Sequence, residues 1–429
     1  MATVTTLQLS SHSSSGGASR GCPDAHELER SNGRRRMCKG WSEDARLQRL
    51  EALVDETGVS LPNLALKLED APRLQGQIEN FIGVVRVPVG VAGPLRVRGG
   101  AADGEVYVPL ATTEGALVLS VARGAEVLTA AGGARVRASE PEVTRVPLFV
   151  FADAGHAEAA EAWVTSRLDE VRVAAEATTR HGRLLRLEPV RLGRRLLLRF
   201  VYVTADAAGQ NMVTVATEAA CRWLRARPPF ADAEFFTLES AASLDKKMAT
   251  LALTSRRGRR VDAEATIPRD IVTDQLHATP EAIARTAREG GYACAAAGII
   301  GAQAQLANVL AALFIATGQD AACVVESGTG VTVFETTAAG DLYASVTIPN
   351  LMLGTVGGGT RLDTQRECLA LMGCQGAGRA ARLAEIAGAV ALAGELSLVA
   401  ALAADAFGQA HKCFGRPPAD QVTEQADRS

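Results

Sequence analysis

VPLFVF at Val146–Phe151 begins the stretch of sequence that decides the fold. A helical stretch, HAEAAEAWVTSRLDEVRVAAEATTR, follows at 156–180, and the apolar runs LLRLEPVRL at 184–192 and RRLLLRFVYVTA at 194–205 come next. A second helical run begins after Gln210, and AEFFTLES at 233–240 closes the series. Strand, helix, strand, strand, helix and strand in this order form the split βαβ motif of ferredoxin-like modules. We therefore predict an inserted ferredoxin-like domain at 146–239.

The flanks of this stretch are typical of one α/β domain that the insertion interrupts. Upstream, the β-rich runs FIGVVRVPVGVAGPLRV at 81–97 and GEVYVPLATTEG at 104–115 precede the helical run SVARGAEVLTAAGG at 120–133. Downstream come the strand VDAEATIP, an Ala-rich helix, strands around VTVFETT and LYASVTIP, and a long helical region that ends near His411. We predict an α/β (α+β) fold in which 78–145 and 240–414 form a large, helix-rich substrate domain.

The two ends of the chain differ from its middle. Residues 1–40 are polar and include a run of three arginines, which predicts a disordered leader. SEDARLQRLEALVDETG at 42–58 has a Ser cap, an acidic first turn and helical spacing of apolar residues, so 41–77 is predicted to be a small helical unit. Residues 415–429 are Pro-rich and polar, which predicts a flexible tail.

The composition favours an enzyme that acts on a small molecule. The chain has 429 residues, enough for two or three structural units, and 47% of them are hydrophobic. Its formal charge of −3 creates no field that favours nucleic acid or an acidic membrane. The eight cysteines form no Cys-x-x-Cys pair and no zinc-ligand spacing, so we expect reduced core thiols and no metal.

The sequence predicts a cytoplasmic protein that binds no membrane. The first twenty residues lack the basic start and the apolar stretch of a signal peptide. Two Ala-rich stretches, Ala293–Gly318 and Ile386–Phe407, are long enough to be membrane spans. Because they contain polar residues such as Gln303, Asn308 and Glu395, buried globular helices explain them better.

Glycine-rich and helix-starting segments mark candidate anion sites. GTVGGGT at 354–360 follows a predicted strand, and its glycines suit a backbone that turns sharply or approaches a ligand, although a structural turn is the alternative. Gly209 and Asn211 lie at the start of a predicted helix, where an anion can bind. Arg180 offers a guanidinium that can pair with a phosphate. Ordinary capping or surface charge is the alternative for each of these residues.

Few residues are candidates for proton transfer or charge stabilisation. The segment SLDKK at 243–247 has two lysines whose ammonium groups suit an oxyanion, although adjacent lysines are usually solvated surface. Glu114 lies between a strand and a helix, and Asp320 ends an apolar helix; capping explains either position as well. His277 and His411 are the candidates for proton transfer near neutral pH. These residues indicate a soluble α/β enzyme without defining its reaction.

In their order along the chain, these stretches resemble the 3-hydroxy-3-methylglutaryl-coenzyme A (HMG-CoA) reductase family from about residue 78 to residue 416. The motifs that carry the resemblance are ENFIG, PVGVAGPL, ATTEGALVLS, VTRVPLF, DAAGQNMV, DKK, FIATGQD, GTVGGGT and AGELSLVAALAA. In this family a large domain surrounds an inserted ferredoxin-like domain that binds the nicotinamide cofactor. The DKK and TTEG motifs are similar to class I, the eukaryotic type, which implies NADPH and a biosynthetic direction. The membrane-anchor region of the animal and plant enzymes is not found in the sequence, so a soluble bacterial form is expected.

The resemblance implies that the chain reduces (S)-HMG-CoA to (R)-mevalonate and CoA with two NADPH, through hemithioacetal and mevaldehyde intermediates, for isoprenoid biosynthesis. Glu114, Lys246, Asp320 and His411 would be the catalytic residues. Lys246 would stabilise the oxyanion, His411 would protonate the departing CoA thiolate, and Glu114 would protonate the aldehyde oxygen. A carboxyl group that donates a proton at neutral pH needs a raised pKa, so Glu114 is expected to be buried.

The same resemblance implies two binding sets and an assembly. The HMG group would contact Ser120, Arg145, Ser240, Asp245, Lys247 and Asn308. NADPH would contact Thr179, Arg180, Asp206, Gly209, Gln210, Asn211 and Gly357, with Arg180 at the 2′-phosphate. The ENFIG motif at 79–83 usually lies at the subunit contact, which implies a homodimer, or a tetramer, with active sites at the subunit interface.

The chain departs from the family pattern at a few positions: Gln303 and Gln305 replace the common Asn and His, Ala122 and Ala242 stand at frequent Asn positions, and Ala208 and Gln210 replace methionines. These departures bear on affinity more than on the class of reaction. Pro417 stands where animal and plant enzymes carry a phosphorylated serine, so that form of control is not expected. The alternatives are an NADH-dependent degradative reductase and a catalytically silent homologue with a binding role.

Overall fold

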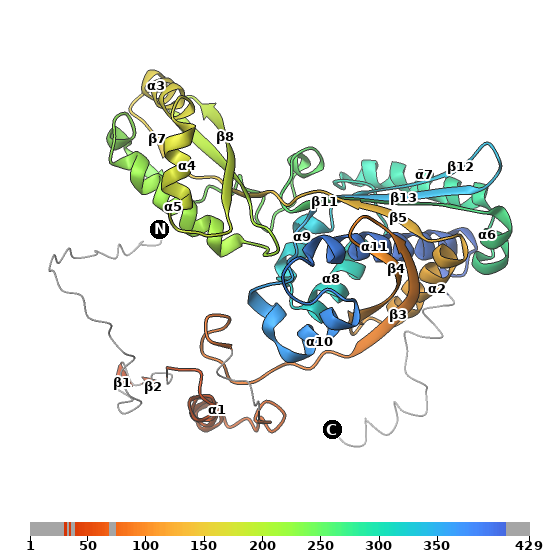
Figure 1. The fold of residues 1–429 in the computed structure, drawn as a ribbon. Helices are drawn as coiled ribbons and strands as arrows, with labels where there is room; N and C mark the ends of the chain where they lie inside the picture. Colours follow the sequence, from red (N-terminus) through yellow and green to blue (C-terminus); the bar gives the residue numbers. More distant parts are fainter. Residues whose placement is uncertain (1–29, 32–33, 36–38, 68–73, 409–429) are drawn as a thin grey trace. The chain divides into compact units, whose positions relative to one another are not determined.

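A computed structural model describes residues 30–31, 34–35, 39–67 and 74–408 of the chain (Figure 1). The chain divides into two compact units, Met1–Val85 and Arg86–Ser429. The second unit contains two β-sheets and every predicted site residue, of which His411 alone lies outside the described residues.

In its described residues, the first unit has one α-helix and one short pair of strands. α1 (Glu43–Thr57) begins at Ser42, whose hydroxyl accepts a backbone N–H from the first turn, and ends at Gly58 in the left-handed conformation. β1 (Arg30–Ser31) pairs with β2 (Arg34–Arg35). The helix predicted after Ser42 is confirmed, whereas the limits 41–77 stay a prediction.

A six-stranded sheet forms the larger part of the second unit, in the order β12-β13-β11-β5-β3-β4. Its strands are β3 (Val89–Arg98), β4 (Asp103–Ala111), β5 (Ala134–Ala138), β11 (Arg259–Ile267), β12 (Val331–Thr336) and β13 (Leu342–Leu351). Neighbouring strands are antiparallel except β3 and β5, which are parallel. The strands upstream and downstream of the insertion therefore join in one mixed sheet.

Helices pack against the six-stranded sheet around a central apolar helix, α11 (Figure 1). They are α2 (Leu117–Ala130), α6 (Arg269–Leu276), α7 (Pro280–Ala297), α8 (Leu306–Thr317), α9 (Val324–Ser327), α10 (Asp363–Leu371) and α11 (Ala380–Ala403), with the 3-10 turns η3 (Thr250–Leu253), η4 (Ala321–Cys323) and η5 (Gly358–Arg361).

Small residues allow α11 to pack closely on its neighbours. A side chain on Gly388 would collide with Val261 of β11, and one on Gly124 of α2 would collide with the backbone of Ala393. α11 is the one helix in the described residues that is long and apolar enough to cross a membrane, and most of it is buried inside the fold. It is therefore a core helix, as predicted for the second Ala-rich stretch.

The second sheet has the strand order predicted for the insertion. β6 (Val143–Arg145) and β7 (Leu148–Val150) lie one after the other along the same side of β9 (Arg195–Val203). β8 (Arg183–Leu192) pairs with the other side of β9, and β10 (Phe235–Thr237) pairs with β7, all antiparallel. This arrangement is a split βαβ motif. The limits 146–239 stay a prediction.

Three helices connect these strands: α3 (Ala154–Thr165), α4 (Leu168–Glu176) and α5 (Gln210–Arg225), followed by the turn η2 (Phe230–Asp232). The helical stretch predicted at 156–180 is therefore two helices, separated at Ser166 and Arg167. Asp153 caps the first helix by accepting the His156 N–H, a boundary that the apolar pattern does not reveal.

The predicted buried helix over Ala293–Gly318 is wrong in its first half. α7 ends at Ala297, where Gly298 adopts a left-handed conformation with φ +69°, and its last turn is mostly exposed. α8 then starts afresh at Leu306 and is mostly buried. A glycine that ends a helix looks like another small residue in an Ala-rich run, which explains the error.

Five cysteines lie in the described residues, and none forms a disulfide. Cys221, Cys323 and Cys374 are buried, whereas Cys294 and Cys368 are partly exposed. The prediction of reduced core thiols is correct for the first three.

Candidate active site

Three loops that are far apart in the sequence meet beside the N-terminus of α5. The Gln319 side chain accepts the Gly354 N–H at 2.8 Å and donates to the Gly354 carbonyl at 3.0 Å. A side chain on Gly354 would lie 2.6 Å from the Ala208 nitrogen. The predicted glycine-rich loop therefore packs directly on the loop that starts α5 and on the loop that contains Asp320.

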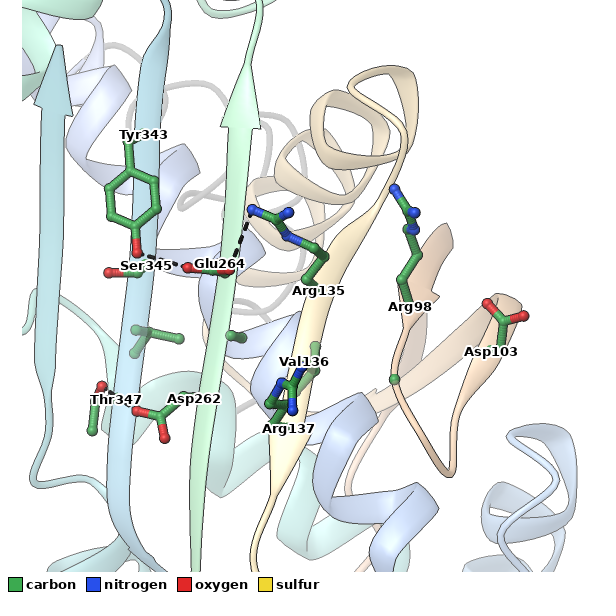
Figure 2. A pocket seen from close by; sticks show the side chains of 13 residues that line it. Arg98, Asp103, Arg135, Val136, Arg137, Asp262, Glu264, Tyr343, Ser345 and Thr347 are labelled. Atoms are coloured by element: carbon green, nitrogen blue, oxygen red, sulfur yellow. Dashed lines mark hydrogen bonds and ion pairs between the residues drawn. The ribbon is translucent and has the colours of Figure 1, made fainter. Parts of the chain in front are cut away.

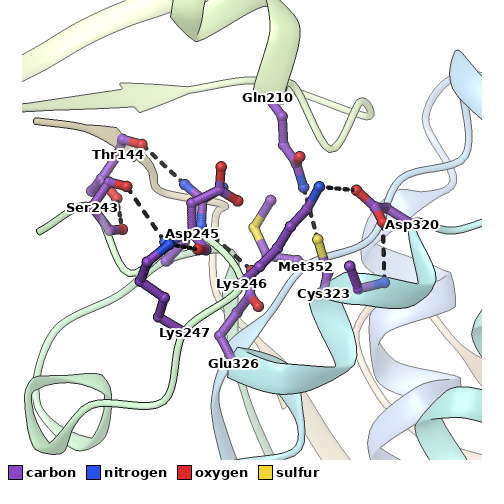
Figure 3. Close-up of polar contacts among 12 residues, drawn as sticks. Thr144, Gln210, Ser243, Asp245, Lys246, Lys247, Asp320, Cys323, Glu326 and Met352 are labelled. Carbon is purple, nitrogen blue, oxygen red and sulfur yellow. Dashed lines mark hydrogen bonds and ion pairs between the residues drawn. The ribbon is translucent and has the colours of Figure 1, made fainter. Parts of the chain in front are cut away.

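A lysine and an aspartate form an ion pair where these loops meet. The Lys246 ammonium lies 2.8 Å from Asp320 Oδ2, and both side chains are about two-fifths exposed. Figure 3 shows Lys246 extended from its own loop toward Asp320. The hydrogen bond that Lys246 donates to Asp320 is the largest cause that raises the Lys246 pKa above its usual value. Lys246 is therefore a stable, accessible cation, as oxyanion stabilisation requires.

The loop that carries Lys246 has an unusual backbone. Ala241, Leu244 and Lys246 have φ values of +68°, +66° and +55°, in the left-handed region that favours glycine. Non-glycine residues keep such conformations only where the surrounding structure holds them. The backbone of this loop is therefore held by specific contacts.

Alternating charges beneath the loop supply those contacts. Arg145 donates to Glu239 at 3.0 Å and to Asp245 at 3.2 Å, and Arg257 donates to Asp245 at 2.6 Å. Arg257 is fully buried and also lies 3.5 Å from Glu326. Burial raises the pKa of Asp245, but Arg257 and Arg145 outweigh it and hold that pKa below its usual value.

Two further predicted residues lie at this loop. Ser240 donates to the Val146 carbonyl at 2.7 Å, and the Lys247 ammonium donates to the Asp245 carbonyl at 3.1 Å. The structure thus brings Arg145, Ser240, Asp245 and Lys247 together with Lys246. Glu239, Arg257 and Glu326 belong to the same cluster, and the sequence analysis did not identify them.

The N-terminus of α5 is open to an anionic ligand. Gly209 precedes the helix with φ +75°, no side chain caps the first turn, and Asn211 is exposed. A helix N-terminus with unused N–H groups attracts phosphate. Thr179 donates to Met212 Sδ at 3.0 Å, which places the neighbouring Arg180 close to this turn. Arg180 is exposed and makes no ion pair that involves the described residues.

The other predicted cofactor residues are placed differently. The Asp206 carboxylate accepts the N–H groups of Gly378 and Ala380 at the start of α11. Gln210 donates to Cys323 Sγ at 2.8 Å and so connects α5 to the turn after Asp320. Gly357 has φ +79° and open space around it. Asp206 therefore holds a helix start, whereas Gly357 leaves room for a ligand.

A second group of predicted residues lies elsewhere in the unit. The Asn308 amide donates to Glu114 Oε1 at 3.3 Å, and the Ser120 hydroxyl contacts the Ser397 hydroxyl at 3.1 Å. Glu114 is exposed in the chain, so the expectation of a buried carboxyl group is wrong for this structure. The reason is its position, in the loop between β4 and α2 with only the Asn308 amide as a side-chain partner.

Helix α8 separates the two groups. Asn308 is in its first turn and Asp320 follows its C-terminal end, with Thr317 as the last helical residue. The ten residues from Asn308 to Thr317 extend over about 14 Å of helix. In the described residues no hydrogen bond or ion pair joins Glu114 to Lys246, since Glu114 contacts Asn308 and Lys246 contacts Asp320.

Two of the departures from the family pattern lie near the second group, where Gln305 is buried and Gln303 is partly buried. The Gln305 side chain donates to the Gly394 carbonyl, and its backbone N–H donates to Glu395. Gln303 donates to the Gly328 carbonyl at 3.2 Å. Both glutamines thus hold the loop before α8 rather than pointing freely into the site. His277 follows α6 and joins neither group in the described residues, and His411 lies outside them.

A hollow on the outer face of the large sheet contains none of the predicted site residues (Figure 2). It lies on the side of β11 away from α11, and several of its polar side chains contact one another: Arg135 contacts Glu264, Tyr343 donates to Glu264 and Thr347 donates to Asp262. These pairs describe a solvated sheet face, and the candidate site remains at the loops around Lys246.

The family model and the related proteins that the chain matches all belong to one family. Residues 44–416 match the family model of hydroxymethylglutaryl-coenzyme A reductase. The chain is 45% identical to the 3-hydroxy-3-methylglutaryl-coenzyme A reductase of Methanothermobacter thermautotrophicus, over 82% of this chain and 88% of that protein. It is 46% identical to the Halobacterium salinarum enzyme of the same name, over 79% of this chain and 84% of that protein.

Solved structures support the fold. The 3-hydroxy-3-methylglutaryl-coenzyme A reductase of Streptococcus pneumoniae superposes with a TM-score of 0.62 at 18% identity, over 83% of this chain and 96% of that chain. A structure of the class II enzyme from the same organism, bound to NADPH in open conformations, gives 0.62 at 19% identity over the same shares. At this identity the likeness concerns the fold alone.

Proposed function

This chain belongs to the hydroxymethylglutaryl-coenzyme A reductase family, and from that premise we propose how its residues reduce HMG-CoA to mevalonate. The observation that carries the proposal is the ion pair between Lys246 and Asp320, 2.8 Å long, at the meeting point of three loops. The ammonium group is charged, accessible and fixed in direction, as a group that stabilises a developing oxyanion must be.

We propose that Lys246 acts on the thioester carbonyl oxygen. Reduction at the carbonyl carbon puts negative charge on that oxygen, and the ammonium stabilises it while the hemithioacetal forms. Asp320 keeps Lys246 protonated and pointed at the oxygen. Arg145, Ser240, Asp245 and Lys247 surround this position and are proposed to bind the HMG group.

We propose NADPH as the reductant, because the residues around the α5 N-terminus fit a phosphorylated dinucleotide. When bound, NADPH supplies the hydride. The uncapped turn after Gly209 and the open space at Gly357 suit the pyrophosphate. Arg180 and Thr179 would hold the 2′-phosphate, which NADH lacks. Gln210 and Asn211 line the same turn. Asp206, in the loop before α5, connects that loop to the start of α11 by accepting the Gly378 N–H.

We propose that Glu114 and His411 handle the protons. His411 protonates the departing thiolate so that CoA leaves as a thiol, and Glu114 protonates the aldehyde oxygen in the second reduction. Each turnover then consumes two NADPH and two protons and releases mevalonate and CoA. Asn308 contacts Glu114 and Ser120 lies in the first turn of α2, and both are proposed to bind the same substrate.

We propose a homodimer with active sites between subunits. In one chain Glu114 contacts Asn308 at the start of α8 and Lys246 contacts Asp320 beyond its end, yet the reaction needs both at one substrate. A second copy solves this problem if the Glu114–Asn308 group of one subunit faces the Lys246–Asp320 group of the other. Such a contact would also cover Glu114, and burial raises a carboxyl pKa.

The test is an assay with HMG-CoA and either NADPH or NADH, in which nicotinamide oxidation and CoA thiol release are measured together. We expect two NADPH oxidised per thiol, and no oxidation with Lys246→Ala. Oxidation of NADH alone would contradict the proposed cofactor. Absence of oxidation with both cofactors would contradict the function and leave the fold in place.

A further inference from the structure

Glu395 is a buried carboxyl group that the reaction described above does not use. It lies in the apolar helix α11, and its side chain is fully buried. One carboxylate oxygen accepts the Gln305 N–H at 2.6 Å, and the other accepts the Ala304 N–H and the Thr332 hydroxyl, both at 2.8 Å. A buried charge is costly unless it is hydrogen-bonded, and here three donors meet that need. Glu395 therefore holds the loop before α8 against α11 and β12.

Two hydrogen bonds lead from Glu395 to Asn308. Gln305 is the N-cap residue of α8, so Glu395 accepts the N–H of the residue at which the helix begins. The Gln305 carbonyl in turn accepts the Asn308 N–H at 3.0 Å. A side chain on Gly394 would lie 2.6 Å from Val309, so α11 also packs directly on this first turn. The start of α8 is thus fixed from α11.

The contact replaces one that many helices make within themselves. In a capping box, a Glu or Gln at the third helical position accepts the N–H of the N-cap residue. Asn308 occupies that position in α8, but the acceptor for the Gln305 N–H comes from Glu395 instead. The Asn308 amide donates to Glu114 Oε1 at 3.3 Å. Capping from a second helix therefore leaves the side chain at the third position available to the site.

We infer that Glu395 is a positioning residue for Asn308: it caps α8 from α11, so that the Asn308 side chain is directed to Glu114 and to the substrate. The inference rests on the roles proposed for Asn308 and Glu114. Loss of the cap would leave the Gln305 N–H without its partner, and a buried donor in that state moves or takes another acceptor. Either change displaces the first turn of α8, which carries Asn308.

Glu395→Gln tests the inference. Glutamine has the shape of glutamate but only one carbonyl oxygen, so the N–H of either Ala304 or Gln305 then faces an NH2 group. We expect kcat/KM for HMG-CoA to fall on the order of 10- to 100-fold, because small displacements of a group that contacts the substrate have effects of this size. KM for NADPH should be unchanged, since the cofactor is proposed to bind at α5. An unchanged kcat/KM would overturn the inference.

Glu385→Gln is the matched control. Glu385 lies in the same helix, is also buried and accepts three donors: one oxygen accepts the Gly100 N–H, and the other accepts those of Ala101 and Ala102. This loop joins β3 to β4 and contains no predicted site residue. Both variants should lose stability in urea, whereas only Glu395→Gln should lose kcat/KM. Equal losses of kcat/KM would indicate a general effect of α11 and contradict the positioning role.

A double-mutant cycle shows which residue Glu395 acts through. If it acts through Asn308, adding Glu395→Gln to Asn308→Ala should lower kcat/KM for HMG-CoA by no more than about twofold, since both changes remove the same contact. Losses that multiply would speak against the inference, because a purely structural role would not depend on the Asn308 side chain.

Two further variants separate this inference from the proposed function. If Lys246→Ala keeps the wild-type rate, the proposed function fails; if Asn308→Ala does, the inference about Glu395 falls. If Lys246→Ala is inactive and Asn308→Ala lowers kcat/KM, while Glu395→Gln matches the wild type, only the positioning role is overturned.

Should Glu395→Gln fail to fold, Thr332→Val decides. It keeps both N–H bonds of the loop and removes the hydroxyl that holds the Glu395 carboxylate to β12. We expect kcat/KM for HMG-CoA to fall on the order of fivefold, the equilibrium effect of one typical hydrogen bond, with KM for NADPH unchanged. A wild-type kcat/KM in Thr332→Val would rule out the positioning role.

Discussion

Lys246 must keep its proton to stabilise an oxyanion, and Asp320 is the neighbour that holds the proton in place. The hydrogen bond to Asp320 raises the Lys246 pKa above the ordinary value of 10.5. A raised lysine pKa means that the charged form persists below that value and is lost as the pH rises through the raised one. The ion pair therefore protects activity at the alkaline end of the pH range.

We predict that Asp320→Asn moves the alkaline limb of the kcat–pH profile to lower pH. Asparagine keeps the oxygen that accepts the Ala322 N–H but removes the charge beside Lys246. The measurement is kcat for HMG-CoA reduction from neutral to alkaline pH. Glu281→Gln is the control, because it removes a carboxylate from the exposed pair with Arg269 far from the site. A shift of equal size in both variants would contradict the assignment.

The second prediction concerns Arg180 and the preference for NADPH over NADH. Arg180→Ala should raise KM for NADPH on the order of 10- to 100-fold, the value of a hydrogen bond between charged groups, and leave the KM for NADH unchanged. Arg285→Ala, on exposed α7, is the matched loss of a surface arginine. An equal rise in KM for the two cofactors would contradict the proposed contact between Arg180 and the 2′-phosphate.

Motifs predict Lys246 and Asp320, but they do not predict what lies beneath them. Arg257 stands in the run SRRGRR at 255–260, which looks like exposed surface. Its burial arises because Asn350 of β13 accepts its backbone N–H and Thr144 of β6 accepts its side chain, contacts between segments far apart in the chain. For Glu114 the error is the reverse: a buried side chain was predicted from its proposed role as a proton donor, but the side chain is exposed in a single chain.

Close helix packing gives a prediction about elements. Gly124→Ala should destabilise the protein by about 1–3 kcal/mol, because the added methyl group collides with the Ala393 backbone where α2 crosses α11. Gly290→Ala is the control: it lies in exposed α7 with nothing within 4 Å of the new methyl group. There the same change should stabilise by about 0.5–1 kcal/mol, since glycine is a poor helix former. Urea unfolding measures both, and equal signs would contradict the packing argument.

Element types could be read from the apolar pattern more reliably than element ends. Strands β7 to β10 and helices α1 and α11 follow the predicted order because their alternation or helical spacing is strong. The break between α7 and α8 depends on Gly298 adopting φ +69°, and α3 ends before α4 at a bend of the backbone. Helix ends of this kind depend on the backbone conformation of one or two residues and not on the hydrophobic pattern.

Assembly of the whole molecule gives the last prediction. Glu114→Gln and Lys246→Ala should each be inactive alone, yet a mixture allowed to exchange subunits should recover about a quarter of wild-type activity. Half of the random dimers are then mixed, and one of the two sites in each mixed dimer contains both native residues. If Glu114 and Lys246 acted within one chain, every site would lack one of them and the mixture would stay inactive.

The overall architecture could be predicted from the order of strand and helix signals, because the split βαβ series at 146–239 interrupts an α/β pattern. The contact between the inserted module and the catalytic loops could not be predicted from the sequence. It depends on contacts such as Gln210 with Cys323, and Gly354 with Ala208, that join segments more than 100 residues apart. No local pattern encodes pairs of this kind.

The place of α11 in the chain has a consequence for biosynthesis. The helix packs against the middle strands of the large sheet, yet its residues, Ala380–Ala403, leave the ribosome after all six strands of that sheet. Until α11 has been synthesised, the apolar faces of the strands that pack on it stay exposed. The split βαβ module needs no residue beyond β10 to complete its own sheet, so it is free to fold during translation. Nascent chains stalled before residue 380 should therefore carry a folded insertion and a large domain that chaperones recognise.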